Sequence, residues 1–116
     1  TDHVVARTID LLKEVEDKYD TALLYVSDHG ESLGENGIYL HGLPYSIAPA
    51  QQTQVPMVMW FSPGFAVRNG LDLACLRREA EQPTSHDALF HTVLGLVDVT
   101  TQIHEPALDI GSACRS

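Results

Sequence analysis

The stretch that decides the fold is residues 22–42, ALLYVSDHGESLGENGIYLHG. Residues 22–26 form an apolar run that is rich in β-formers and bounded by polar residues, which predicts a buried strand. The polar residues of 27–42 therefore follow the carboxyl end of a strand. In open α/β sheets ligands bind at such ends, because the loops that leave the strands aim side chains into one crevice.

The loop after this strand carries the residue types from which metal sites are built: Asp28, His29, Glu31 and His41. Carboxylate oxygens and neutral imidazole nitrogens both suit zinc, with bonds of about 2.0 to 2.2 Å. The glycines between them allow the loop to fold tightly around a centre. A solvated acidic turn fits the same residues, since an Asp carboxylate readily accepts hydrogen bonds from nearby backbone N–H groups. Residue spacing alone leaves both interpretations open.

The rest of the chain predicts an α/β fold with a sheet sandwiched by helices. Apolar residues recur at helical spacing over 1–18, with Val4, Val5, Ile9, Leu12 and Val15 on one face. Residues 55–61 predict a second strand, which Ser62-Pro63-Gly64 ends. A weak helical pattern covers 70–81 and a strong one covers 84–97. No period runs through 44–54, so we expect an irregular, ordered excursion there.

Five further polar residues in or near the helix predicted over 84–97 are assigned structural roles. Thr84 and Asp87 have the spacing of a capping box at the start of this helix. His86 and Asp87 fit a helix start, where they cap the chain and complement the dipole, better than a second metal pair. His91 and His104 have no ligand partners in sequence and are expected to be structural or exposed.

Composition limits the classes of function. With 116 residues and 44% hydrophobic content, the chain fits one small domain or part of one. The formal net charge of −9 argues against nucleic acid, because phosphate backbones require clustered Lys and Arg. The same charge disfavours simple adsorption to anionic lipid. No apolar stretch approaches the roughly 20 residues of a membrane helix.

The run SDHGESLGENGIYLHG, with Ala48-Pro49 and Gln54-Val55-Pro56 after it, resembles the phosphoethanolamine transferases that modify lipid A in Gram-negative bacteria. The Asp-His-Gly core is shared by the wider alkaline phosphatase and sulfatase superfamily, whereas the extension to His41-Gly42 is more specific. The resemblance implies a sulfatase-like fold. It also implies that residues 1–116 are the C-terminal part of a periplasmic catalytic domain.

By this resemblance, the whole enzyme uses zinc to transfer phosphoethanolamine from phosphatidylethanolamine to lipid A phosphate groups, as in polymyxin and colistin resistance. Asp28 and His29 match ligands of the catalytic zinc. His41 matches a catalytic histidine that binds the phosphoethanolamine donor or a second zinc, and Glu31 is expected beside it at the substrate. The family's nucleophilic Thr, which forms a phospho-intermediate, lies upstream of the residues present here, as do a Glu ligand, another His and the membrane anchor. The chain is therefore expected to be an inactive fragment of a protein anchored at the periplasmic face of the inner membrane.

Other functions also fit parts of the pattern. A sulfatase, or a phosphotransferase acting on a different glycan, would keep Asp28 and His29 without needing the extension to His41. A non-catalytic module could hold a structural ion in the same loop, closed by four protein ligands. A serine hydrolase based on Ser27 is weaker, because its flanks do not form the Gly-x-Ser-x-Gly elbow.

The two cysteines, Cys75 and Cys114, lack redox or zinc-finger spacing. A disulfide indicates an oxidising compartment, whereas buried free thiols are the alternative. The resemblance favours oxidation, because the family's catalytic domains face the periplasm and are disulfide-rich. Whether the two pair with each other or with cysteines upstream is left open by the sequence.

Overall fold

The computed structural model describes residues 1–116, and the chain separates into two compact units. The first unit contains residues 1–14 and 22–60, and the second contains 15–21 and 61–116. Helices and short strands occur together, as the α/β prediction requires. None of the helices combines the length and apolar character needed to cross a membrane.

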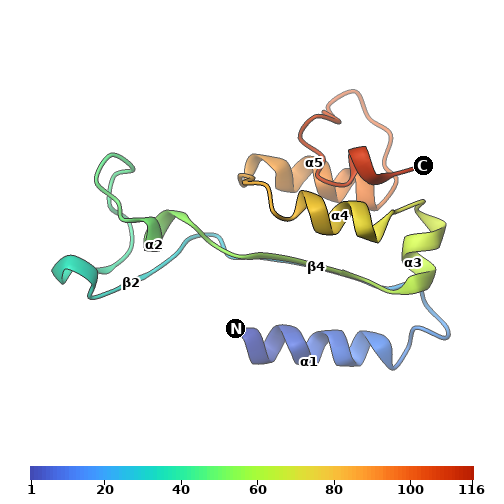
Figure 1. Ribbon diagram of the computed structural model, residues 1–116, viewed down its shortest axis with the longest axis horizontal. Helices are drawn as coiled ribbons and strands as arrows, with labels where there is room; N and C mark the ends of the chain where they lie inside the picture. Colours follow the sequence, from blue (N-terminus) through green and yellow to red (C-terminus); the bar gives the residue numbers. More distant parts are fainter. The chain divides into compact units, whose positions relative to one another are not determined.

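The first unit carries two small sheets. Its elements are α1 (Asp2–Lys13), β1 (Ala22–Val26), β2 (Ser32–Leu33), the 3-10 turn η1 (Glu35–Gly37), β3 (Tyr39–Leu40), α2 (Ala50–Thr53) and β4 (Met57–Phe61), whose last residue belongs to the second unit. Strands β1 and β4 are neighbours in one sheet, and β2 pairs with β3 in the other. The strands predicted at 22–26 and 55–61 are confirmed as β1 and β4. Helix α1 runs beside β4 (Figure 1).

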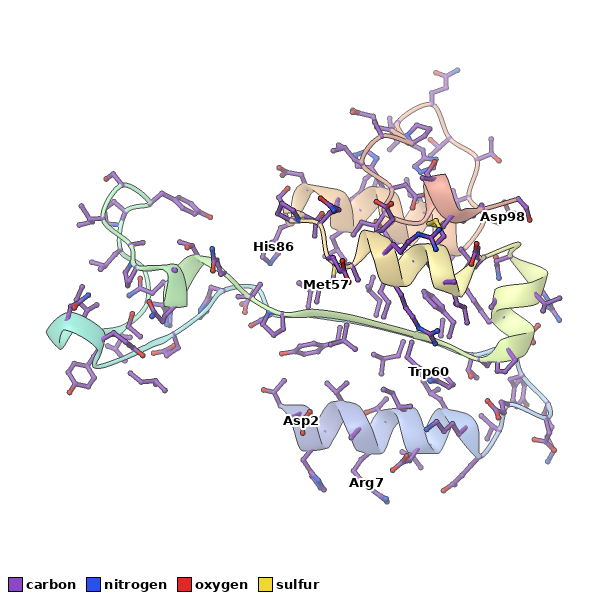
Figure 2. All side chains as sticks on the ribbon, in the orientation of Figure 1. Asp2, Arg7, Met57, Trp60, His86 and Asp98 are labelled. Atoms are coloured by element: carbon purple, nitrogen blue, oxygen red, sulfur yellow. A yellow bond between two sulfur atoms is a disulfide. The ribbon has the colours of Figure 1, made fainter.

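Helix α1 is amphipathic, but it is shorter than predicted. Val5, Ile9 and Leu12 are half-buried, whereas Arg7 points away from β4 (Figure 2). The expected extension of the helix to Lys18 is wrong, because α1 ends at Lys13. Val15 is 37% exposed and the residues around it are charged, so no packing supports a further helical turn. Val4 was expected on the packed face and is 65% exposed.

Two short helices lie in segments where the sequence predicted no helix. In the excursion over 44–54, α2 forms immediately after Pro49. A helix of four residues is too short to show an apolar period, which is why the pattern missed it. The Ser62-Pro63-Gly64 signal ends β4 as expected, but it also starts α3 (Pro63–Arg68). Ser62 caps this helix by accepting a hydrogen bond from the Phe65 N–H at 3.2 Å, with proline at the first turn.

The second unit packs α3 with α4 (Leu73–Glu79), α5 (Asp87–Leu96) and the 3-10 turn η2 (Ser112–Cys114). Its buried core consists of Ala66, Leu71, Leu76, Leu96 and Cys114. A disulfide with an S–S distance of 1.96 Å joins Cys75 of α4 to Cys114 of η2 and is visible in Figure 2. The oxidised alternative is therefore confirmed, and the two cysteines pair with each other.

The start of α5 differs in detail from the predicted capping box. The Ser85 hydroxyl, rather than Thr84, accepts a hydrogen bond from the Asp87 N–H at 3.3 Å. The same hydroxyl donates to Asp87 Oδ2 at 3.1 Å. The prediction of a Thr84–Asp87 box is thus wrong by one residue, because a serine two positions before Asp87 forms the tighter turn.

His91 and His104 have the structural roles that the sequence suggested. His91 Nδ1 accepts a hydrogen bond from the Glu105 N–H at 2.9 Å. His104 Nε2 lies 3.4 Å from the buried carboxylate of Asp109, which also binds Arg115. His91 therefore ties the segment after α5 to that helix, and His104 lies beside the Asp109–Arg115 ion pair.

Candidate functional site

The loop after β1 places Asp28 and His29 two and three residues beyond the end of the strand. The Asp28 Oδ1 atom accepts a hydrogen bond from the His29 N–H at 3.0 Å, and the Ser27 hydroxyl donates to the His29 carbonyl at 2.8 Å. These contacts form the acidic turn that the sequence allowed as an alternative. They occupy only one carboxylate oxygen of Asp28, so the turn and a metal ligand are compatible at this residue.

The imidazole of His29 is oriented for coordination through Nε2. Its Nδ1 atom lies 2.9 Å from the Gly30 carbonyl oxygen, so the tautomer with the proton on Nδ1 makes this hydrogen bond. Nε2 then carries the free lone pair, as metal-binding histidines require. It lies 3.8 Å from Asp28 Oδ2, close to the separation of about 3.3 to 3.6 Å between two ligands of a tetrahedral zinc.

Glu31 and His41 are brought together by the second sheet. Strands β2 and β3 are antiparallel, with Ser32 opposite Leu40 and Leu33 opposite Tyr39. The next position in this register places Glu31 opposite His41. Glu31 Oε2 lies 3.0 Å from His41 Nδ1, which donates the hydrogen bond and leaves Nε2 of His41 free for chemistry.

The hairpin between these strands depends on residues that tolerate a left-handed backbone. Gly34 and Gly37 have φ values of 121° and 74°, and Asn36 between them has φ 54°. Glu35 Oε2 closes the turn by accepting from the Leu33 N–H at 2.7 Å. Glu35 is therefore used in the turn, which separates it from the candidate site.

The Asp28–His29 pair and the Glu31–His41 pair meet through their two histidines. The rings of His29 and His41 lie with their centroids 4.0 Å apart, at an interplanar angle of 31°. One ligand atom from each of His29, Glu31 and His41 lies within 4.8 Å of the others. One carboxylate oxygen and two imidazole nitrogens are a donor set that fits zinc. The structure thus groups three of the four predicted residues around one point, with Asp28 contacting His29 from the side.

The sequence missed the residues that hold this loop in place. Gln52 of α2 is 6% exposed, and its side chain donates to the Ser32 hydroxyl at 2.9 Å. Ser32 itself is 1% exposed. Buried polar residues of this kind carry no local signal, because their partners lie about 20 residues away in the chain.

A family model and several known proteins are similar to this chain. A family model described as Sulfatase matches residues 1–99. Phosphoethanolamine transferase EptA of Escherichia coli (strain K12) is 54% identical over 115 residues, which are 98% of this chain and 21% of that protein. The chain therefore spans about a fifth of the length of this relative.

Solved structures are similar over nearly all of the chain. The integral membrane protein lipooligosaccharide phosphoethanolamine transferase A (EptA) from Neisseria meningitidis has a TM-score of 0.91 and 49% identity, covering 98% of this chain and 22% of that one. The C-terminal periplasmic domain of phosphoethanolamine transferase EptC from Campylobacter jejuni has a TM-score of 0.79 and 42% identity, covering 94% of this chain and 33% of that one.

The predicted resemblance to phosphoethanolamine transferases is confirmed by these matches, as is the predicted α/β, sulfatase-like fold. A single family model matches most of the chain, including the loop with Asp28, His29, Glu31 and His41. The chain belongs to the sulfatase family.

Proposed function

We propose that this chain is the C-terminal part of the catalytic domain of a zinc-dependent phosphoethanolamine transferase. The whole enzyme takes phosphoethanolamine from phosphatidylethanolamine and transfers it to phosphate groups of lipid A. The observation that carries the proposal is the convergence of His29, Glu31 and His41 at the end of β1, with Asp28 beside them. The similarity to EptA proteins supports the reaction class.

Asp28 and His29 are proposed as ligands of the catalytic zinc. Their side chains offer Oδ2 and Nε2, while the hydrogen bond from His29 Nδ1 to the Gly30 carbonyl fixes the ring orientation. When bound, zinc lowers the pKa of a nucleophile and neutralises charge on phosphoryl oxygens. The nucleophile is a threonine outside these 116 residues, which receives the phosphoryl group before the acceptor does.

His41 and Glu31 are proposed to act on the donor. The carboxylate of Glu31 holds the His41 proton on Nδ1, so that Nε2 faces a bound group and takes or gives a proton there. The positively charged amine of phosphoethanolamine is complementary to the Glu31 carboxylate, whose side chain is 41% exposed. This pair therefore orients the headgroup and assists departure of the lipid alcohol.

We also propose that the whole protein works at the periplasmic face of the inner membrane. The Cys75–Cys114 disulfide supports an oxidising compartment. The similar domain of the Campylobacter jejuni protein is periplasmic by its title, and the similar Neisseria meningitidis protein is an integral membrane protein.

The test is Asp28→Ala in the proposed full-length transferase. Loss of one ligand leaves an under-coordinated metal, so zinc content and transfer to lipid A should fall together. Asp17→Ala, which removes an exposed carboxylate in the turn after α1, is the matched control and should change neither. Stoichiometric zinc with normal transfer in Asp28→Ala would contradict the ligand assignment.

The match to the Sulfatase family model supports one second candidate, a sulfatase within the same family. A sulfate ester carries no amine, so hydrolysis of it does not require the Glu31–His41 pair. An assay of the same full-length protein on sulfate esters separates the two functions. Turnover of a sulfate ester that survives His41→Ala, without transfer of phosphoethanolamine, would replace the transferase proposal.

A further inference from the structure

We propose that Gln52 is a positioning residue that sets the distances among His29, Glu31 and His41. The inference deepens the proposed function and rests on it, because it concerns the same site. Gln52 touches none of the three side chains, and its role is exerted through the backbone that carries them.

Gln52 is buried and uses both its main chain and its side chain to hold the loop. Its carbonyl accepts a hydrogen bond from the Gly30 N–H at 3.0 Å. Its Nε2 donates to the Ser32 hydroxyl at 2.9 Å, and its Oε1 accepts from the Leu43 N–H at 3.4 Å. One residue thus binds the loop at three separate positions.

These three positions flank the site residues. Gly30 lies between His29 and Glu31 in the chain, and Ser32 follows Glu31. Leu43 lies two residues after His41, beyond the end of β3. Gln52 therefore fixes both strands of the hairpin on either side of the pair that the register brings together.

The side-chain type suits this task. An amide offers a donor and an acceptor on adjacent atoms, and both are needed here, since Ser32 accepts and Leu43 donates. A lysine or glutamate would place a charge at a position that is only 6% exposed, which is costly. A methionine fills a similar volume without either hydrogen bond.

The experiment compares Gln52→Met with Gln51→Met in the proposed full-length transferase. Gln51 is the exposed neighbour on the same helix, so its variant matches the change in residue type without reaching the loop. Transfer is measured as kcat and KM for the donor, zinc affinity against a competing chelator, and folding by thermal melting. The Gly30 contact is made by the main chain and survives the substitution, so we expect Gln52→Met to keep its zinc affinity. Its kcat for transfer should fall by about 10- to 100-fold, because the Glu31–His41 pair is displaced. Gln51→Met should match the wild type.

The outcomes separate the two proposals. A folded Gln52→Met protein with wild-type kcat and KM overturns the positioning role, even if its melting temperature is lower. If Gln52→Met does not fold, Ser32→Ala removes only the amide's donor contact, and the same two measurements on it decide. A wild-type protein that binds no zinc and transfers no phosphoethanolamine overturns the proposed function itself, and the positioning role with it.

Discussion

Replacing Gly30 by alanine tests how tightly the site loop is seated on α2. A Cβ at Gly30 would lie 1.9 Å from the Gln51 carbonyl oxygen, 2.8 Å from its carbon and 3.1 Å from Gln52 Cα. All of these atoms belong to the backbone, so no side chain can turn aside. The backbone of Gly30 does not have a positive φ, which means that its requirement for glycine is steric rather than conformational.

The size of the effect follows from this contact. The 1.9 Å separation is about 1.5 Å short of ordinary van der Waals contact, so the loop must move away from α2 by a comparable amount. Forcing an extra methyl group into a packed site costs about 1 to 3 kcal/mol of folding free energy. The shift displaces His29 and Glu31 together, and a misplacement of about 1 Å at a catalytic group costs about 10²-fold in rate.

The assay measures zinc content and phosphoethanolamine transfer in the proposed full-length transferase carrying Gly30→Ala. We expect transfer to fall by about 10²-fold with reduced zinc affinity. Gly37→Ala is the matched control, since a Cβ there meets no atom within 4 Å. Its φ of 74° strains an alanine locally, which lowers stability by about 1 to 2 kcal/mol without moving the site. Wild-type zinc affinity and transfer rate in Gly30→Ala would refute the close seating of the loop on α2.

Three further predictions follow from the same structure. His41→Ala in the full-length transferase should retain zinc and melting temperature but slow transfer by about 10²- to 10⁴-fold, and an unchanged rate with full zinc would remove its proposed role. Replacing Cys75 and Cys114 by alanine opens a loop with a sequence separation of 39, for which the chain-entropy model gives about 4 kcal/mol of lost stability, measured by denaturant unfolding. Asp72 caps α4, and hydrogen bonds from the Cys75 and Ala74 N–H groups lower its pKa. The stabilisation by this cap is therefore complete above the ordinary pKa of Asp and is lost as pH falls through the lowered pKa. The stability difference between wild type and Asp72→Ala should therefore narrow in acid, and a difference that stays constant from neutral pH to below the lowered pKa would contradict the cap.

Some of the fold is encoded locally and could be predicted from the sequence. The apolar run at 22–26 forms β1, and the strong helical pattern forms α5, because each has enough residues to show its period. The segment over 70–81 contains α4 despite a weak pattern. The short elements β2, β3 and α2 could not be predicted, since they are held by contacts to distant residues rather than by propensity.

The candidate site also combines features that the sequence predicts with features that only the fold decides. The residue types of the candidate site could be read from the sequence, because Asp28, His29, Glu31 and His41 lie within a glycine-rich loop that follows a strand. Which of them meet was decided by tertiary structure. The antiparallel register of β2 and β3 places Glu31 against His41, and the Gln52 contacts hold that register next to His29. Residue types are local properties of a chain, whereas distances among side chains ten residues apart depend on how the backbone between them is folded and held.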